Sequence, residues 1–285
     1  MQNRGFIVVL LFFPLLGFSQ GSLDNSTGLS SSLSKTEYYL NLFFKTDLTS
    51  AGSSDEITSF ISKLETRRNS FRSDKDFLHH LFVKAHQKLL KRYTQYCSFN
   101  ALTDDGTYNC LTGTALYALL LDHFNFDYKV IETNYHIFLI TKTSKGDVLF
   151  EATDPVNGFV DSSPEIKKRI SMYKENIIQN ANSDKTYYRY QFNLYNTVGL
   201  DQLLGLMYYN LSIDAYNKQD FTSSINYLDQ AVKLYQSPRI EEFSKIILLT
   251  LTARDLDKSE KEICLKKIQS LRKKMPGLAS NSIPH

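Results

Sequence analysis

Tryptophan is absent from the 285 residues of the chain, and cysteine occurs only three times. A carbohydrate-binding platform of indole rings is therefore excluded, although the 18 tyrosines leave a tyrosine platform open. Three cysteines are too few for a disulfide-stapled scaffold, and their odd number leaves at least one free thiol. The chain also lacks a long block of like charges, since its 33 basic and 30 acidic residues are interspersed. We therefore expect no nucleic-acid partner.

The one apolar run near the start, residues 6–18, is well short of the roughly 20 residues that a transmembrane helix needs. Arg4 precedes it, and Gly17 and Ser19 supply small residues for a cleavage site. This pattern predicts a signal peptide over residues 1–19, cleaved after Ser19. The expected mature protein is exported, periplasmic or secreted, without a transmembrane span. Its first residues, 20–35, are rich in Ser, Gly and Asn and predict a flexible leader.

The rest of the chain changes pattern twice. Apolar residues at helical spacing predict helices over residues 36–46, 55–68 and 73–93, and a further apolar helix begins at Cys110. Strands are expected over residues 128–133, 136–143 and 148–153, the last two joined by a turn at 145–147. The predicted fold class is α+β. Helices and a small antiparallel sheet occupy residues 36–165, an all-α region covers residues 166–275, and 276–285 form a tail.

Within the all-α region, residues 205–238 resemble one tetratricopeptide repeat in length and in the position of the turn. The residues that fit the two helices and the turn are Tyr208, Leu211, Ala215, Asp220, Phe221, Ile225, Leu228 and Ala231. Two positions depart from the pattern, with Ser212 in place of Gly and Ser224 in place of Ala. Because a single repeat cannot bury its apolar face alone, we expect it to pack on neighbouring helices or on the preceding domain.

Three residues of the central stretch could together carry nucleophilic chemistry. Cys110 follows Asn109, a suitable N-cap, at the start of a predicted helix, where the helix dipole favours a negatively charged thiolate. His136 begins a predicted strand and Asp154 ends the next one. If those strands are antiparallel neighbours, the imidazole lies beside the carboxylate, which would orient the ring as in a catalytic triad.

The run NCLTGTALYALLLDHFNFDYKVIETNYHIFLI, followed by LFEATD, resembles the core of transglutaminase-like proteins. The resemblance covers roughly residues 75–160, and Cys110, His136 and Asp154 map onto the family's catalytic motif. It implies an exported thiol enzyme that hydrolyses, or transfers the acyl group of, an amide bond in a peptide or protein. The alternative is an inactive fold that binds a peptide or protein partner through the helical repeat.

An enzyme of this kind also needs donors for the oxyanion. The backbone amide of Cys110 would be one donor, and the side chain of Gln95 or Tyr96 is the candidate for the other. A competing interpretation is a disulfide between Cys97 and Cys110, which would remove the nucleophile.

No cofactor or metal is expected. His79, His80 and His86 share a predicted helix, but His79 and His86 are not at the i, i+4 spacing of a metal pair, and no third ligand is evident. The remaining cysteine, Cys264, lies between Ile263 and Leu265 and is expected to pack in a core.

Overall fold

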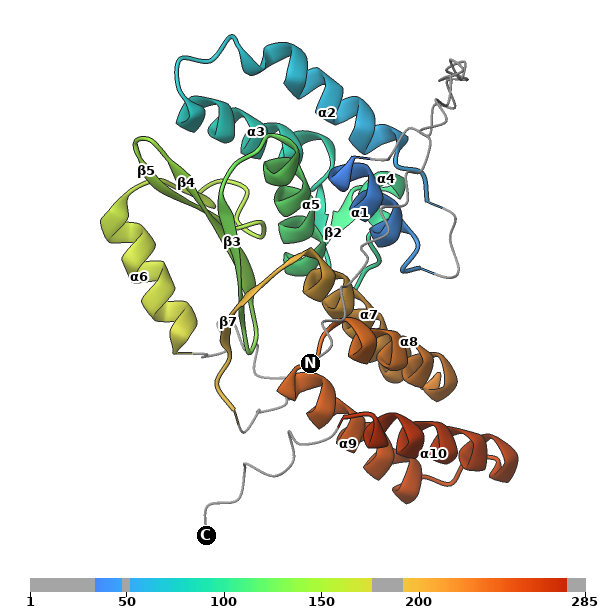
Figure 1. Cartoon of the computed structure of the whole chain (residues 1–285). Coiled ribbons are helices and arrows are strands. Elements are labelled where there is room, and N and C mark those ends of the chain that lie inside the picture. The colour runs from blue at the N-terminus through green and yellow to red at the C-terminus, as the bar shows by residue number, and fades with distance from the viewer. Residues whose placement is uncertain (1–33, 48–51, 176–191, 276–285) are drawn as a thin grey trace, which may run out of the picture. The chain divides into compact units, whose positions relative to one another are not determined.

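A computed structural model describes residues 34–47, 52–175 and 192–275 (Figure 1). The expected signal peptide, the leader up to residue 33 and the tail lie outside these residues. The helices are α1 (Lys35–Phe44), α2 (Asp55–Arg68), α3 (Asp74–Lys88), α4 (Ala101–Asp104), α5 (Cys110–His123), α6 (Ser163–Lys174), α7 (Leu200–Asn217), α8 (Phe221–Leu234), α9 (Pro238–Ala253) and α10 (Lys258–Lys273). The strands are β1 (Arg92–Tyr93), β2 (Thr107–Tyr108), β3 (Tyr128–Thr133), β4 (Ile137–Thr143), β5 (Gly146–Phe150), β6 (Phe159–Val160) and β7 (Tyr195–Val198). The predicted α+β class is confirmed.

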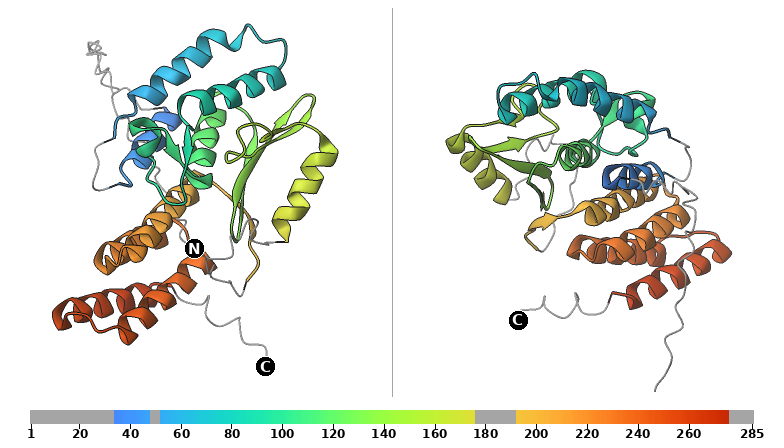
Figure 2. Two further views of the ribbon diagram at one scale, coloured as in Figure 1. Left: turned by 180° about the vertical axis from the view of Figure 1, so that it is seen from behind. Right: turned by 45° about the horizontal axis from the view of Figure 1, so that its top comes forward.

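Five strands form an antiparallel sheet in the order β6-β5-β4-β3-β7. Helices α5 and α6 cover its two faces (Figures 1 and 2). Successive side chains of a strand point to opposite faces, so Leu139 and Phe150 enter the main core around α5, whereas Phe138 and Leu149 enter a smaller core that includes Ile166 of α6. Both faces are therefore buried, which explains why the strands are apolar almost throughout.

Helix α5 packs closely against the end of β5. Nearly all of its residues are buried, and a Cβ atom added at Gly113 would lie 2.8 Å from the Cβ atom of Ala152. The absence of a side chain at Gly113 thus allows the helix to approach the sheet. This close approach brings the N-terminus of α5 next to the end of the sheet where β5 stops.

Two features of the sheet differ from the sequence prediction. Strand β5 ends at Phe150 rather than at residue 153, because the chain turns to bring β6 alongside β5. Strand β7 pairs with β3 although it lies within residues 166–275, which were predicted to be all helical. The described residues form one compact unit.

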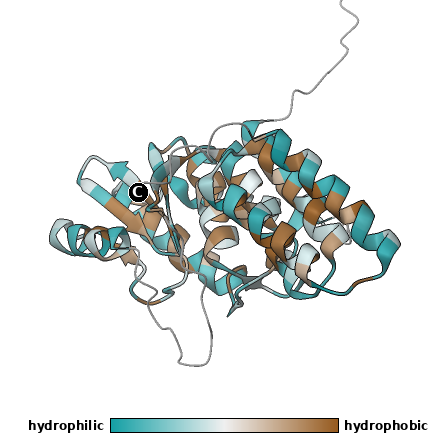
Figure 3. Ribbon diagram, turned by 90° about the horizontal axis from the view of Figure 1, so that it is seen from below, coloured by the Kyte–Doolittle hydropathy of each residue, from teal (hydrophilic) through white to brown (hydrophobic). Residues whose placement is uncertain are grey.

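Helices α7 to α10 form a helical layer with its own apolar core. The helices carry hydrophobic and hydrophilic residues side by side along their length (Figure 3), as expected for helices with one buried face. Helices α7 and α8 pack as a hairpin at Ser212 and Ser224, where each hydroxyl donates to the other residue's carbonyl oxygen, at 2.6 and 2.9 Å. Two small residues thus allow the close crossing.

The helical layer also packs on the preceding part of the fold. Leu203, Leu204 and Met207 of α7 belong to the main core, in which they join residues of α1 and α5. The hairpin of α7 and α8 therefore buries its apolar surface against α9 and α10 on one side and against the main core on the other. None of the helices in the described residues is long and apolar enough to span a membrane.

Candidate active site

Cys110 occupies the first position of α5, and local hydrogen bonds fix the start of this helix. The Asn109 side chain accepts from the Thr112 amide at 2.8 Å, and the Thr112 hydroxyl accepts from the Asn109 amide at 3.0 Å. This reciprocal capping satisfies two backbone donors that a helix N-terminus leaves free. The half-buried thiol therefore lies at the positive end of the dipole of a fixed helix.

His136 lies in the tight connection between β3 and β4. The Thr133 amide donates to the His136 carbonyl oxygen at 2.8 Å, and the His136 amide donates to the Thr133 hydroxyl at 3.1 Å. The imidazole ring packs against Tyr173 of α6, with ring centroids 4.9 Å apart, and stacks over Phe138 at 6.3 Å. Hydrogen bonds therefore fix the backbone of His136, and aromatic contacts fix its ring.

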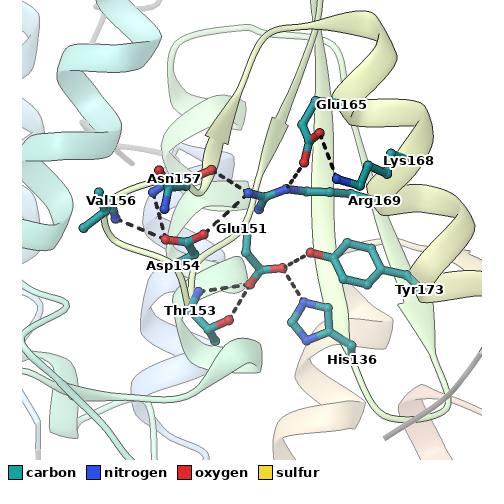
Figure 4. Close-up of polar contacts among 10 residues, drawn as sticks. All are labelled: His136, Glu151, Thr153, Asp154, Val156, Asn157, Glu165, Lys168, Arg169 and Tyr173. Atoms are coloured by element: carbon teal, nitrogen blue, oxygen red, sulfur yellow. Dashed lines mark hydrogen bonds and ion pairs between the residues drawn. The ribbon is translucent and has the colours of Figure 1, made fainter. Parts of the chain in front are cut away.

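Glu151 is the carboxylate that contacts this ring. His136 Nε2 and Glu151 Oε2 are 2.5 Å apart, and the Tyr173 hydroxyl donates to the same oxygen at 2.8 Å. The other oxygen accepts from the amide and hydroxyl of Thr153, at 3.0 and 2.6 Å. Figure 4 shows these donors converging on the carboxylate from a strand end, a turn and α6. Only 4% of the Glu151 side chain is exposed, so its carboxylate is stabilised by these hydrogen bonds within the protein.

The electrostatics favour a charged pair. Burial alone would lower the pKa of His136, but the Glu151 carboxylate and a hydrogen bond with the Cys110 side chain raise it to about 10. Burial would raise the pKa of Glu151, yet His136 and Thr153 lower it to about 2. The ring is therefore an imidazolium at neutral pH. Because Nε2 faces Glu151, Nδ1 is the nitrogen that remains for the thiol.

Tyr173 completes the surroundings of the pair. Burial and the neighbouring Glu151 raise the pKa of Tyr173, so its phenol stays protonated and donates its hydrogen bond throughout the neutral range. Cys110, His136 and Glu151, here called the triad, thus come from the N-terminus of α5 and from the ends of two neighbouring strands.

The prediction that Asp154 orients His136 is wrong. Its carboxylate accepts from the amides of Val156 and Asn157, at 3.3 and 2.8 Å, and pairs with Arg169 of α6 at 3.5 Å. These bonds stabilise the turn that leads to β6 (Figure 4). The cause is the early end of β5, which leaves Asp154 within a turn.

Alternation along the strands provides a signal that could have identified Glu151. His136 is two residues before Phe138 and Glu151 is two residues after Leu149, so each is expected on the same face as that neighbour. Phe138 and Leu149 point to the same face of the sheet, which places His136 and Glu151 together. Glu151 is also the one charged residue in the run VLFEAT. No comparable signal exists for Tyr173, because it reaches the site from a helix on the opposite side of the sheet from α5.

The two candidate oxyanion residues lie next to the cap of α5. The Asn109 side-chain amide donates to the Gln95 carbonyl oxygen at 3.4 Å, and the Gln95 side-chain amide donates to the Tyr96 hydroxyl at 3.3 Å. Strand β1 ends shortly before Gln95, and β2 ends just before Asn109. Because these two strands pair in parallel, the segment with Gln95 and Tyr96 leaves the pair beside the start of α5. Gln95 is exposed and Tyr96 is half-buried, so both are near the surface at this end of the helix.

All three cysteines of the chain lie in the described residues and are unpaired, so the alternative disulfide between Cys97 and Cys110 is not formed. The Cys97 sulfur is 3.7 Å from the Thr112 hydroxyl. Burial raises the pKa of the Cys97 thiol to about 12, which keeps it protonated. Cys264 is fully buried in the core of the helical layer, as the sequence predicted.

The histidines of α3 pack against aromatic rings. His79 contacts Phe159 and His80 contacts Phe71, with ring centroids 5.0 and 4.9 Å apart. His86 is buried beside Phe82. The described residues contain no cluster of three or more His, Cys, Asp or Glu side chains arranged to hold a metal ion.

The sequence matches no protein-family model, and comparisons with curated proteins and with solved structures give no match either.

Proposed function

We propose that the protein is a transglutaminase-like thiol enzyme that hydrolyses amide bonds in peptides or proteins through Cys110, His136 and Glu151. The observation that carries the proposal is the His136 ring, which is bonded to the buried Glu151 carboxylate and lies near enough to Cys110 for the thiol to raise its pKa. A thiolate, a base that holds it and a group that orients the base are what acyl transfer to sulfur requires.

The reaction would proceed in two steps. The Cys110 thiolate attacks the carbonyl carbon, and His136 gives its proton to the leaving amine, so that a thioester and a free amine form. Water then attacks the thioester while His136 takes up one of its protons, and the carboxylic acid leaves with regeneration of the Cys110 thiolate and the His136 imidazolium. Glu151 keeps the ring oriented and stabilises its charged form in both steps. The backbone amide of Cys110, with Gln95 or Tyr96, would bind the oxyanion.

The order of elements supports the family assignment, because a Cys opens a helix, a His precedes a strand and a carboxylate follows the next strand. The hairpin of α7 and α8, with small residues at its crossing, supports the resemblance to a tetratricopeptide repeat. The proposed export to the periplasm or medium is supported by the sequence of residues 1–19 alone.

The test combines thiol reactivity with turnover. Iodoacetamide alkylation of the purified protein is followed from pH 4 to pH 10 and mapped by mass spectrometry, and we expect the label on Cys110. His136→Ala should move this profile to higher pH. A defined peptide library should be cleaved by the wild type and by Cys97→Ala, the matched control, but not by Cys110→Ala.

Hydrolysis and transfer are separated by adding a primary amine to the same reaction. Incorporation of the amine at the acyl group would indicate transfer, whereas new carboxyl termini alone would indicate hydrolysis. A folded protein whose Cys110 resists alkylation at every pH would contradict the proposal and favour the inactive, peptide-binding alternative.

A further inference from the structure

A residue of the helical layer is hydrogen-bonded to the turn that precedes His136. Arg239, in the first turn of α9, donates from Nη2 to the carbonyl oxygen of Thr133 at 2.5 Å and to that of Asn134 at 3.1 Å. These carbonyls belong to the connection between β3 and β4 that ends at His136. The Arg239 side chain is only 13% exposed, so this contact is made inside the protein.

The same guanidinium is anchored by a buried carboxylate. Arg239 Nε lies 2.8 Å from Oε1 of Glu132, whose side chain is 1% exposed. The other oxygen, Oε2, accepts from the Tyr235 hydroxyl at 2.5 Å. Nε and Oε1 form an ion pair without the geometry of a hydrogen bond, while Nη2 donates to the two carbonyls. The charge of Glu132 therefore holds the guanidinium of Arg239 beside the turn.

The turn is also held from the segment that leads into β7. The Asn134 side-chain amide donates to the Phe192 carbonyl oxygen at 2.6 Å, and its oxygen accepts from the Leu194 amide at 2.7 Å. Arg239 and this segment thus support the turn from elements that follow it in sequence. Within the described residues, Arg239 provides the direct link from α9 to the backbone just before the triad histidine.

We propose that Arg239 is a positioning residue for His136, so that the helical layer is part of the catalytic apparatus and not only a separate binding module. This inference rests on the proposed function. Arg239 does not touch the triad and acts through the backbone of Thr133 and Asn134. Misplacement by about 1 Å of a group that must face the reacting atom can reduce rates on the order of 100-fold.

The experiment compares pH profiles of Cys110 alkylation by iodoacetamide in the full chain. Arg239→Met removes the guanidinium but leaves Glu132 buried without its charge partner, which threatens folding. The double variant Arg239→Met/Glu132→Gln removes both charges and retains an acceptor for Tyr235, so it isolates the loss of the contacts to the turn. The matched control is Arg254→Met, which removes a guanidinium that donates to Gln219 in the same helical layer, at 2.8 Å.

We expect the double variant to alkylate Cys110 at pH 6 at least 10-fold more slowly than the wild type, with its profile moved towards that of His136→Ala. Arg254→Met should have the alkylation profile of the wild type even if its melting temperature falls by as much as that of the double variant. If a purely structural role were correct, the double variant would lose melting temperature and keep the wild-type profile, and this result would overturn the inference.

Failure of the proposed function gives a different result. If the wild type and His136→Ala have the same profile, then His136 does not activate Cys110, and the triad itself is rejected. If these two profiles differ and the double variant follows the wild type, then the triad stands and only the role of Arg239 is rejected. Circular dichroism spectra that match the wild type are required of each variant. If the double variant does not fold, Arg239→Lys replaces it, because lysine keeps a positive charge beside Glu132 and loses the fork of donors to the two carbonyls.

Discussion

Replacement of Glu151 by Gln tests the charged pair directly, because Gln has the same shape and lacks the charge. The pKa of His136 rises from 6.5 to about 10 and that of Glu151 falls from 4.5 to about 2. At about 1.4 kcal/mol per unit, these changes correspond to about 5 and about 3 kcal/mol. The energy of about 5 kcal/mol for His136 also contains the contribution of Cys110. We therefore take the energy of about 3 kcal/mol, from Glu151, for the carboxylate–imidazolium pair.

Loss of about 3 kcal/mol lowers the pKa of His136 by about two units. The pKa of His136 in the variant then lies near 8 (about 10 − 2), so the ring is largely neutral at pH 9, where the wild-type ring keeps its proton. We expect the NMR titration of the His136 ring in Glu151→Gln to lie about two pH units below that of the wild type. Asp154→Asn is the matched control, since it removes a neighbouring carboxylate that is not bonded to the ring. A shift in Asp154→Asn without one in Glu151→Gln would refute the assignment.

The same pair predicts how stability depends on pH. Glu151 stabilises the folded state above its ordinary pKa of 4.5, and this contribution is lost as the pH falls towards 2. His136 contributes fully below 6.5, and its contribution is lost as the pH rises towards 10. The unfolding free energy of the wild type, measured in urea against that of Glu151→Gln, should therefore differ most between pH 4.5 and 6.5. A difference that stays constant from pH 3 to pH 9 would contradict the pair.

Three further results are expected. Cys97 should be alkylated more than 10-fold more slowly than Cys110 at pH 8, because burial raises the pKa of its thiol to about 12; equal rates in a mass-spectrometric time course would contradict this. Gly113→Ala should lower the unfolding free energy by about 1 to 2 kcal/mol in urea, although Ala favours helices, because its Cβ atom would lie 2.8 Å from that of Ala152. An unchanged or higher value would show that the helix can shift away. Tyr173→Phe should cost about 1.5 to 3 kcal/mol by the same measurement, since it removes a hydrogen bond to a charged carboxylate, and a wild-type urea midpoint would contradict this.

Local sequence signals were sufficient for much of the fold. Asn109 followed by an apolar run predicted the start of α5, because a side-chain cap acts within a few residues. The turn at residues 145–147 predicted that β4 and β5 are antiparallel neighbours, and the register joins Thr143 to Gly146. The first prediction placed Cys110 at a helix start and the second placed His136 at the end of the sheet where β5 stops, whereas the expectation that they lie together came from the resemblance to transglutaminase-like proteins.

The remaining parts depend on contacts that are distant in sequence. Strand β7 has four residues, of which Val198 is the buried one, so its pattern is too short to indicate a strand. The choice between Glu151 and Asp154 depended on where pairing with β4 ends, and that point is set by β6. The bond from Arg239 to the turn before His136 spans more than a hundred residues and leaves no local trace.

The pairing of β7 with β3 leaves the sheet incomplete until a late part of the chain joins it. Before β7 is in place, one edge of β3 has no partner, and its backbone amides and carbonyls are open to pairing with another unfolded chain. A chain with the other four strands paired and β7 undocked would thus expose a sheet edge through which it could aggregate, and docking of β7 covers that edge.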